Sequence, residues 1–89
     1  TQQLINGSIQ EETQQVMKNL QAILWEAGIG FEQVVKTTIF LMDMQDFSVV
    51  NEIYATFFSA QFPARETVQV AGLPRGVRVE ISMTALIRS

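Results

Sequence analysis

The 89-residue chain contains no cysteine and no histidine. The absence of cysteine excludes disulfide frameworks, thiol nucleophiles and thiolate metal sites. The absence of histidine removes the commonest general base and metal ligand, so zinc enzymes and Ser–His–Asp hydrolases are excluded as well. We therefore expect no metal site, and any chemistry must rely on arginine, carboxylate, hydroxyl or backbone groups.

Basic residues and long apolar runs are also scarce. Six basic residues against nine acidic ones give a net charge of −3. No stripe of lysine and arginine is present, which argues against a surface that binds nucleic acid. No apolar run approaches the roughly 18 residues of a membrane span. Residues 1–7 lack the basic and apolar pattern of a signal peptide, so we expect a cytoplasmic protein without membrane contact.

The sequence is rich in apolar residues, which make up 47% of the chain against 17% charged residues. This composition excludes a disordered segment. Residues 1–89 suffice for a single domain and leave no room for a second core. Because a domain of this size buries only about 60% of the surface of its unfolded chain, part of the apolar excess should face another subunit. We therefore expect an oligomer.

The first predicted helix covers residues 9–27. Ser8 and Glu11 match the capping box that starts a helix, and an apolar stripe at helical spacing follows. The stripe consists of Val16, Leu20, Ile23, Leu24 and Ala27. Trp25 lies at the margin of this stripe, and we expect it to be a half-buried packing residue.

The second predicted helix begins after Asp46, which is a good N-cap residue. It cannot continue to Pro63, because proline disfavours the helical conformation at the residue before it. Its apolar positions again recur at helical spacing and are Phe47, Val50, Tyr54, Phe57 and Phe58. We expect Tyr54 to lie in the core, with its hydroxyl on a backbone group.

Three strands are predicted, at residues 34–42, 64–70 and 77–87, with a turn at 73–76 before the last one. The order α, β, α, β, β makes the first two strands parallel through a right-handed crossover. The last strand runs antiparallel to them, either beside strand 64–70 or on the far side of strand 34–42. The fold class is therefore α+β, with two helices on one face of a mixed sheet and the other face bare in a single chain.

Arg65, Thr67 and Glu80 are the candidate site residues. Arg65 opens a strand soon after a proline, and a guanidinium at the rim of a sheet can hold a carboxylate through two parallel hydrogen bonds. If the last two strands pair directly, Thr67 opposes Glu80, and Arg65 shares a face with both. If another strand intervenes, Arg65 and Glu80 lie further apart on the same sheet. The alternative to a functional site is that Arg65 and Glu80 only form a half-exposed ion pair.

Four sequence blocks, in one order, resemble the RidA (YjgF-type) family of reactive intermediate deaminases. The blocks are VVKTTIFL at 34–41, DF at 46–47 with VNEIY at 50–54, FPAR at 62–65 and LPRGVRVEI at 73–81. The likeness extends from about Glu11 to the end of the sequence. It implies a chorismate-mutase-like fold that assembles as a homotrimer, with a ligand cleft between neighbouring subunits.

The resemblance also implies an activity without a cofactor. Reactive 2-imino and 2-enamino acids (2-iminobutanoate and 2-aminoacrylate, released by pyridoxal-phosphate dehydratases) are hydrolysed to 2-oxo acids and ammonia. By the same resemblance, Arg65 binds the substrate carboxylate and Glu80 orients or activates the water. Thr67 stands where many members have a cysteine, and Asn51 is a structural residue near the interface. Hydrolysis of an already electrophilic imine carbon needs no metal or covalent nucleophile.

Family members carry a preceding segment with a Gly-Pro-Tyr-Ser-type stretch, which supplies a tyrosine, glycine amides and the opening strands. This chain begins at Thr1 without that segment, so we expect an N-terminally truncated sequence. The alternative function is a non-catalytic regulatory trimer that binds a carboxylate ligand. Retention of Glu80 favours the enzyme, whereas the missing segment favours the regulator. Nucleic-acid cleavage or translation inhibition, also attached to the family, is disfavoured by the acidic balance.

Overall fold

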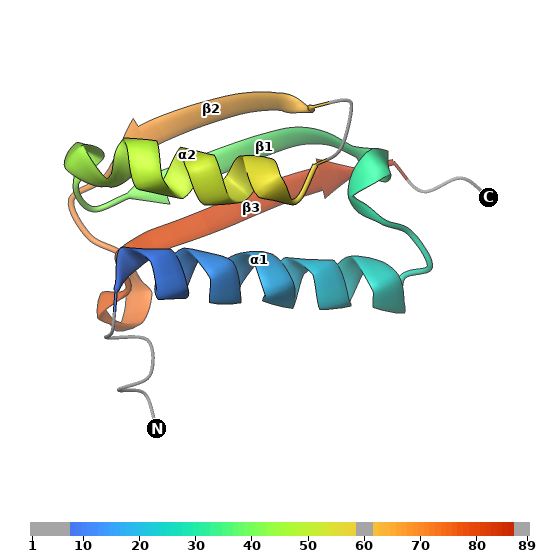
Figure 1. Cartoon of the computed structure of the whole chain (residues 1–89), viewed down its shortest axis with the longest axis horizontal. Helices are drawn as coiled ribbons and strands as arrows, with labels where there is room; N and C mark the ends of the chain where they lie inside the picture. Colours follow the sequence, from blue (N-terminus) through green and yellow to red (C-terminus); the bar gives the residue numbers. More distant parts are fainter. Residues whose placement is uncertain (1–7, 59–61, 87–89) are drawn as a thin grey trace.

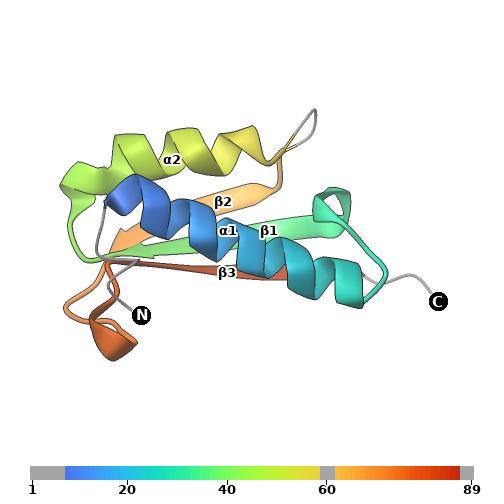
Figure 2. The same cartoon turned by 60° about the horizontal axis from the view of Figure 1, so that its bottom comes forward.

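A computed structural model describes residues 8–58 and 62–86, which form a three-stranded sheet with two helices on one face (Figures 1 and 2). The elements are α1 Ile9–Glu26, β1 Val34–Leu41, α2 Phe47–Thr56, β2 Ala64–Gln69 and β3 Val79–Ala85. All five predicted elements are confirmed. The last strand is shorter than predicted, and the predicted end at residue 87 lies outside the described residues. In the described part of the chain, no helix has the length and apolarity that a membrane crossing requires.

The first turn of α1 is capped and also attached to the far end of the sequence. Ser8 Oγ accepts a hydrogen bond from the Glu11 N–H at 3.1 Å, as the predicted capping box requires. The carboxylate of Glu12 is buried and accepts two hydrogen bonds from Arg78, from the backbone N–H at 2.6 Å and from Nε at 2.8 Å. Because Arg78 directly precedes β3, these bonds join the start of α1 to the start of the last strand.

The inward face of α1 differs from the predicted stripe. Met17 is fully buried and Leu24 nearly so, whereas Ile23 is 64% exposed and Ala27 is exposed. Trp25, expected to be half-buried, is 66% exposed. The prediction was wrong for these three residues because apolar spacing does not fix which of two adjacent helix faces turns inward. Met17 lies at the centre of the face that turns inward.

The sheet has the strand order β2–β1–β3, with β1 in the centre. β2 runs parallel to β1, which confirms the predicted crossover, and β3 runs antiparallel to β1 along its other side. Of the two positions that the sequence left open for the last strand, the structure therefore has the one beyond β1. The β1–β3 pairing extends from Leu41 and Val79 to Val34 and Ala85.

The two faces of the sheet differ in what covers them. Both helices lie on the same side, which we call the covered face (Figure 2). Its strand residues are buried and include Thr37, Ile39, Leu41, Val79 and Ile81. Side chains alternate along a strand, so the positions between these residues point to the other side, which we call the bare face. In β3 those positions are exposed and are Glu80, Ser82 and Thr84.

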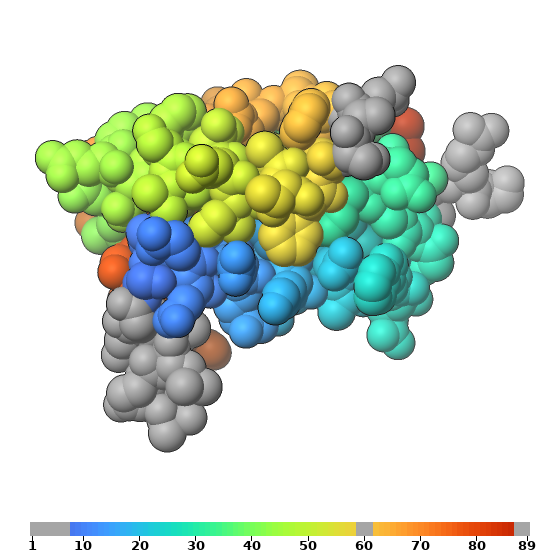
Figure 3. All heavy atoms as spheres, viewed as in Figure 1, coloured from blue at the N-terminus to red at the C-terminus, as the bar shows by residue number. Residues whose placement is uncertain are grey.

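α2 packs beside α1 on the covered face, as the space-filling view shows (Figure 3). The predicted apolar stripe is confirmed, with its most buried residues Val50, Tyr54 and Phe58. Asp46 occupies the N-cap position of α2, as predicted, but it has helical backbone angles and its side chain caps no amide within the described residues. Instead, Asp43 Oδ1 accepts a hydrogen bond from the Gln45 N–H at 2.9 Å and caps a short 3-10 turn, Met44–Asp46, that leads into α2.

Candidate active site

Arg65 lies near the start of β2, an edge strand, two residues after Pro63. Its side chain belongs to the covered face, because Arg65 is paired with the buried Thr37 of β1. The guanidinium carbon lies 5.8 Å from the centre of the Phe47 ring and 5.7 Å from that of the Tyr54 ring. Both rings belong to α2, so cation–π attraction holds this exposed guanidinium against the helix at the edge of the sheet.

A cavity of about 420 Å³ adjoins this guanidinium, and we call it the Arg65 cavity. Its lining comes from α2 and from the chain leading into β2, and consists of Asn51, Tyr54, Ala55, Phe62, Pro63 and Arg65. One cation thus faces aromatic and aliphatic walls. That combination suits a small carboxylic acid with a short apolar tail, because the cation binds the carboxylate and the walls contact the tail.

Asn51 contributes an amide to the same cavity. Its Oδ1 atom is buried and has no hydrogen-bond partner among the described residues. A buried acceptor without a partner favours a ligand or a second chain that supplies an N–H or O–H group. The sequence predicted a structural role near an interface for Asn51, and this role stays a prediction. The structure adds that Asn51 lies in the lining of the Arg65 cavity.

Tyr54 forms the inner wall of the cavity and is 2% exposed. Its hydroxyl donates a hydrogen bond to Thr37 Oγ1 at 3.1 Å, not to the backbone group that we expected. Burial raises the pKa of Tyr54 above 10.0, while the bond to Thr37 and the charge of Arg65 oppose this shift. Tyr54 is therefore a neutral donor at neutral pH, and it fixes the aromatic ring against which Arg65 rests.

Thr67 follows Arg65 by two positions and lies on the covered face, opposite the buried Ile39. Its Oγ1 atom is buried and has no hydrogen-bond partner among the described residues. Thr67 is not part of the cavity lining. The structure thus places Thr67 on the same face as Arg65 but does not bring it into the cavity, and its predicted role in substrate binding stays a prediction.

Glu80 lies on the bare face, exposed and away from the Arg65 cavity. It is paired with Phe40 of β1, whereas Arg65 is paired with Thr37. Phe40 and Thr37 are an odd number of positions apart, so their side chains and those of their partners point to opposite faces. Of the two arrangements that the sequence left open, the structure has the one in which a strand intervenes. Because β1 lies between β2 and β3, Arg65 and Glu80 do not share a face and lie further apart on the same sheet. The same geometry excludes an ion pair between Arg65 and Glu80 within one chain.

The cavity also contains residues that the sequence analysis did not assign to it. Phe62 forms part of its lining and is 56% exposed, and Phe47 supports the guanidinium. A signal for one side of the cavity is present, because Phe47, Asn51 and Tyr54 are spaced four and three residues apart and so share one face of α2. Which strand residue meets this helix face depends on the β1–α2–β2 crossover, which spacing within the helix does not reveal.

Among residues 8–58 and 62–86, no group of three or more acidic side chains is arranged to hold a metal ion. The chemistry that the arrangement offers is therefore carboxylate binding by Arg65, amide contacts from Asn51 and a separate carboxylate, Glu80, on the bare face. A ligand held by Arg65 in one chain cannot reach Glu80 of that chain, because the sheet lies between them.

A comparison with protein families matches residues 1–87 to the family described as Endoribonuclease L-PSP. The fold with two helices on a mixed sheet is also that of solved structures named for L-PSP, YjgF and Rid proteins, which confirms the predicted α+β class. The chain belongs to this family, so the predicted membership of the RidA (YjgF-type) proteins is confirmed.

Individual relatives carry two kinds of name. The 2-iminobutanoate/2-iminopropanoate deaminase of Mus musculus is 55% identical over 84 residues, which cover 94% of this chain and 62% of the mouse protein. AldR of Lactococcus lactis, whose name describes a regulator, is 49% identical over 87 residues, covering 98% of this chain and 69% of AldR. The crystal structure of E. coli TdcF with bound serine has a TM-score of 0.86 and 37% identity, covering 93% of this chain and 67% of TdcF. The chain thus spans about three fifths of the mouse deaminase.

Proposed function

We propose that the chain belongs to a hydrolytic deaminase that converts 2-imino and 2-enamino acids to 2-oxo acids and ammonia. The observation that carries this proposal is the Arg65 cavity, in which a guanidinium backed by two aromatic rings faces a small, partly apolar space. The 55% identity to the mouse 2-iminobutanoate/2-iminopropanoate deaminase supports the same chemistry.

The reaction requires few protein groups. Water adds to the imine carbon and forms a C–O bond, and one of its protons passes to the imine nitrogen to give a carbinolamine. The hydroxyl group then loses its proton as the C=O bond forms, the nitrogen takes up this second proton, and the C–N bond breaks to release ammonia and leave the 2-oxo acid. The protein must hold the substrate carboxylate in one orientation and accept a proton from the attacking water. Arg65 serves the first task, because a guanidinium binds a carboxylate through two parallel hydrogen bonds. Glu80 is the residue that we assign to the second task.

The positions of Arg65 and Glu80 require more than one copy of the chain. Since the two residues lie on opposite faces of one sheet, a substrate on Arg65 can meet only the Glu80 of a neighbouring copy. The bare face is suited to such a contact, because it carries Phe40 and Val68 at its centre beside Glu80. We therefore propose that the substrate clefts lie between subunits, with Arg65 and Glu80 supplied by different copies; the family resemblance implies that the assembly is a homotrimer.

Activity of the natural protein tests the reaction. Threonine dehydratase and threonine generate 2-iminobutanoate, and a trapping amine that reacts with the imine reports how much escapes hydrolysis. The protein should accelerate formation of 2-oxobutanoate, and Arg65→Ala should lower kcat/KM about 100-fold by removing a charge-assisted bidentate contact. Arg65→Lys should recover only part of this loss. A rate equal to that in buffer, or full activity of Arg65→Ala, contradicts the proposal.

Mixed assemblies test the sharing of the site. Arg65→Ala and Glu80→Gln should each be nearly inactive alone. If the two variants are unfolded and refolded together, random mixing places an intact arginine beside an intact glutamate in about one quarter of the interfaces. About a quarter of the wild-type activity should then return. If both residues of a site came from one chain, mixing would restore nothing.

A non-catalytic, carboxylate-binding regulator is the second candidate. Two observations favour it: Glu80 does not line the Arg65 cavity, so a carboxylate can bind there without the proposed water-activating group, and the chain is similar to AldR. Calorimetry with 2-oxobutanoate distinguishes the two, because a regulator would bind this acid equally well after Glu80→Gln and show no turnover. The family description names an endoribonuclease, but six basic against nine acidic residues do not form a surface for a phosphate backbone. For the deaminase we propose a cytoplasmic location, where dehydratases release such imines.

A further inference from the structure

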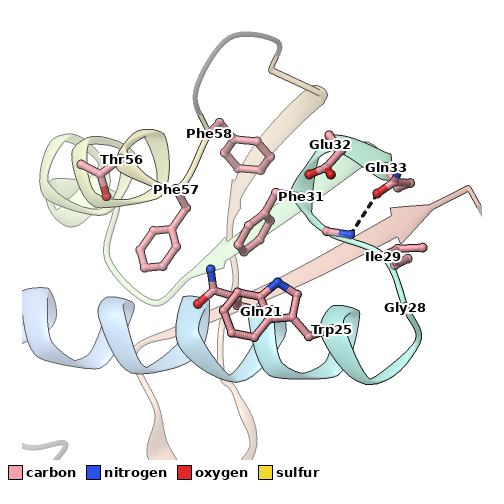
Figure 4. A pocket seen from close by; sticks show the side chains of 11 residues that line it. Gln21, Trp25, Gly28, Ile29, Phe31, Glu32, Gln33, Thr56, Phe57 and Phe58 are labelled. Carbon is pink, nitrogen blue, oxygen red and sulfur yellow. Dashed lines mark hydrogen bonds between the residues drawn. The ribbon is translucent and has the colours of Figure 1, made fainter.

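A second hollow lies at the opposite end of α2 from Phe47, next to the C-terminal end of α1, and we call it the aromatic groove (Figure 4). It has a volume of about 650 Å³. Its lining comes from the end of α1, the following turn and the end of α2, and consists of Gln21, Trp25, Gly28, Ile29, Gly30, Phe31, Glu32, Gln33, Thr56, Phe57 and Phe58. None of these residues lines the Arg65 cavity, so the two sites are separate.

Trp25 is the feature of this groove that core packing does not explain. It is 66% exposed although tryptophan is the largest apolar side chain, and it projects from α1 toward Phe31 and Phe57 (Figure 4). The inner wall is rigid, because Phe31 packs against Phe57 with ring centres 5.8 Å apart and against Phe58 at 5.1 Å. An exposed indole beside a fixed aromatic wall is suited to clamp a flat or cationic group.

The charge around the groove favours a cation. Among the described residues, Glu32 is the only ionisable one in the lining, and it is exposed. Its carboxylate folds back over the turn, since a methyl group placed on Gly30 would lie 2.7 Å from Glu32 Oε1. The C-terminal end of α1 adds partial negative charge, and its last turn contains no basic residue. The nearest cation along α1, Lys18, precedes Trp25 by about two turns, or roughly 10 Å.

The groove also offers hydrogen-bond acceptors. The amide of Gln21 extends from α1 toward Phe57, and Glu32 supplies carboxylate oxygens on the other side (Figure 4). Gln33 is already engaged, because its Oε1 accepts the Gly30 N–H at 2.9 Å. A guanidinium fits this combination better than an ammonium, since it is planar, stacks on aromatic rings and donates several N–H groups in one plane.

From these observations we propose that the aromatic groove is a docking site for an arginine side chain of a partner protein, stacked on Trp25 and paired with Glu32. The proposal is independent of the deaminase function, because it involves no residue of the Arg65 cavity. Loss of binding at the groove should leave imine hydrolysis unchanged.

Trp25 is the only tryptophan of these 89 residues, and the part of a fluorescence change that Trp25→Phe abolishes reports on the groove. The probe is the blocked tripeptide acetyl-Gly-Arg-Gly-amide, titrated into the natural protein at low salt. Its matched control replaces arginine by citrulline, which has the same shape and no charge. We expect saturable quenching by the arginine peptide with a Kd between about 0.1 and 10 mM, the range of a single stacked and paired cation, and at least threefold weaker binding of the citrulline peptide.

Two single-site variants locate the contact. Glu32→Gln removes the carboxylate from the groove and should weaken arginine-peptide binding about threefold at low salt, with a smaller difference at high salt. Glu26→Gln removes an exposed carboxylate from the same helix end without altering the lining, and should change the affinity by less than half as much. Phe57→Leu removes one ring of the aromatic wall and should also weaken arginine-peptide binding. Circular dichroism checks that each variant is folded.

Three outcomes would overturn the proposal. One is equal binding of the arginine and citrulline peptides, which would mean that charge has no part in recognition. Another is an effect of Glu26→Gln as large as that of Glu32→Gln, which would mean attraction to the net charge alone. The third is no saturable change in Trp25 fluorescence up to about 10 mM peptide, which would mean that the groove does not bind this group.

Discussion

The covered and bare faces of the sheet carry different candidate site residues, Arg65 on the covered face and Glu80 on the bare face. On the covered face, α2 fixes the aromatic rings that hold Arg65, and the cavity beside them is formed within one chain. On the bare face, Glu80 points to solvent beside Phe40, with no helix above it. The difference teaches that, under the proposed function, one chain forms the substrate-binding cavity by itself, whereas water activation depends on what covers the bare face.

The largest expected effect comes from altering the bare face itself. Phe40→Lys places a charge at its centre, and burying that charge between copies costs several kcal/mol. We expect this variant to remain folded but to dissociate into single chains, and imine hydrolysis to be lost with the assembly. Sedimentation velocity gives the mass of the particle. Ile23→Lys, on an exposed position of α1, is the control and should leave the mass unchanged. Assembly of Phe40→Lys equal to that of the wild type would show that the bare face is not the interface.

The next effect concerns the core beneath the covered face. Leu41 is fully buried at the end of β1, and Leu41→Ala should lower the free energy of unfolding by about 3 kcal/mol through lost burial and a cavity. Urea unfolding monitored by circular dichroism measures this loss. Ile23→Ala is the matched truncation of an exposed aliphatic residue and should cost less than about 1 kcal/mol. Equal losses for the two variants would contradict the assignment of the core to this face.

A smaller effect is expected from the hydrogen bond that fixes Tyr54. Tyr54→Phe leaves Thr37 Oγ1 buried without this donor and should lower stability by about 1 kcal/mol. Thr37→Val removes the other partner, and the double variant should cost less than the sum of the two single variants. A double-variant loss equal to that sum would show that the two hydroxyls do not stabilise each other.

The smallest effect is the pH dependence of Tyr54, which is the only tyrosine of the chain. Burial raises the pKa of this hydroxyl above 10.0 in the folded protein. Because the folded state holds the proton more tightly than the unfolded chain, this stabilisation is complete below pH 10 and is lost as the pH rises through the folded pKa. The midpoint of the phenolate absorbance should therefore lie at a higher pH in the folded protein than in the unfolded chain. Arg65→Ala should raise the midpoint further, since it removes a charge that lowers the pKa; a lower midpoint would contradict the contact.

The sequence was sufficient to predict the helices, the strands and the parallel pairing, because apolar periodicity and the crossover rule depend on local spacing. It was not sufficient to place β3, since pairing with β1 and pairing with β2 leave the same alternation in residues 79–85. That choice decides whether Glu80 shares a face with Arg65. The exposure of Trp25 could not be predicted either, because the rotation of α1 about its own axis depends on the packing around Met17. The family resemblance assigned roles to Arg65 and Glu80, which stay predictions, without revealing that the two residues lie on opposite faces of the sheet.

The central place of β1 has a consequence for the order of events during synthesis. Both neighbours of β1 follow it in the chain, and its pairing with β3 is complete only when Ala85 reaches Val34. The bonds between Glu12 and Arg78 likewise join α1 to a segment that is made 66 residues later. Residues 79–85 must therefore leave the ribosome before the β1–β3 pairing forms, and until then an apolar strand has one edge open to other nascent chains.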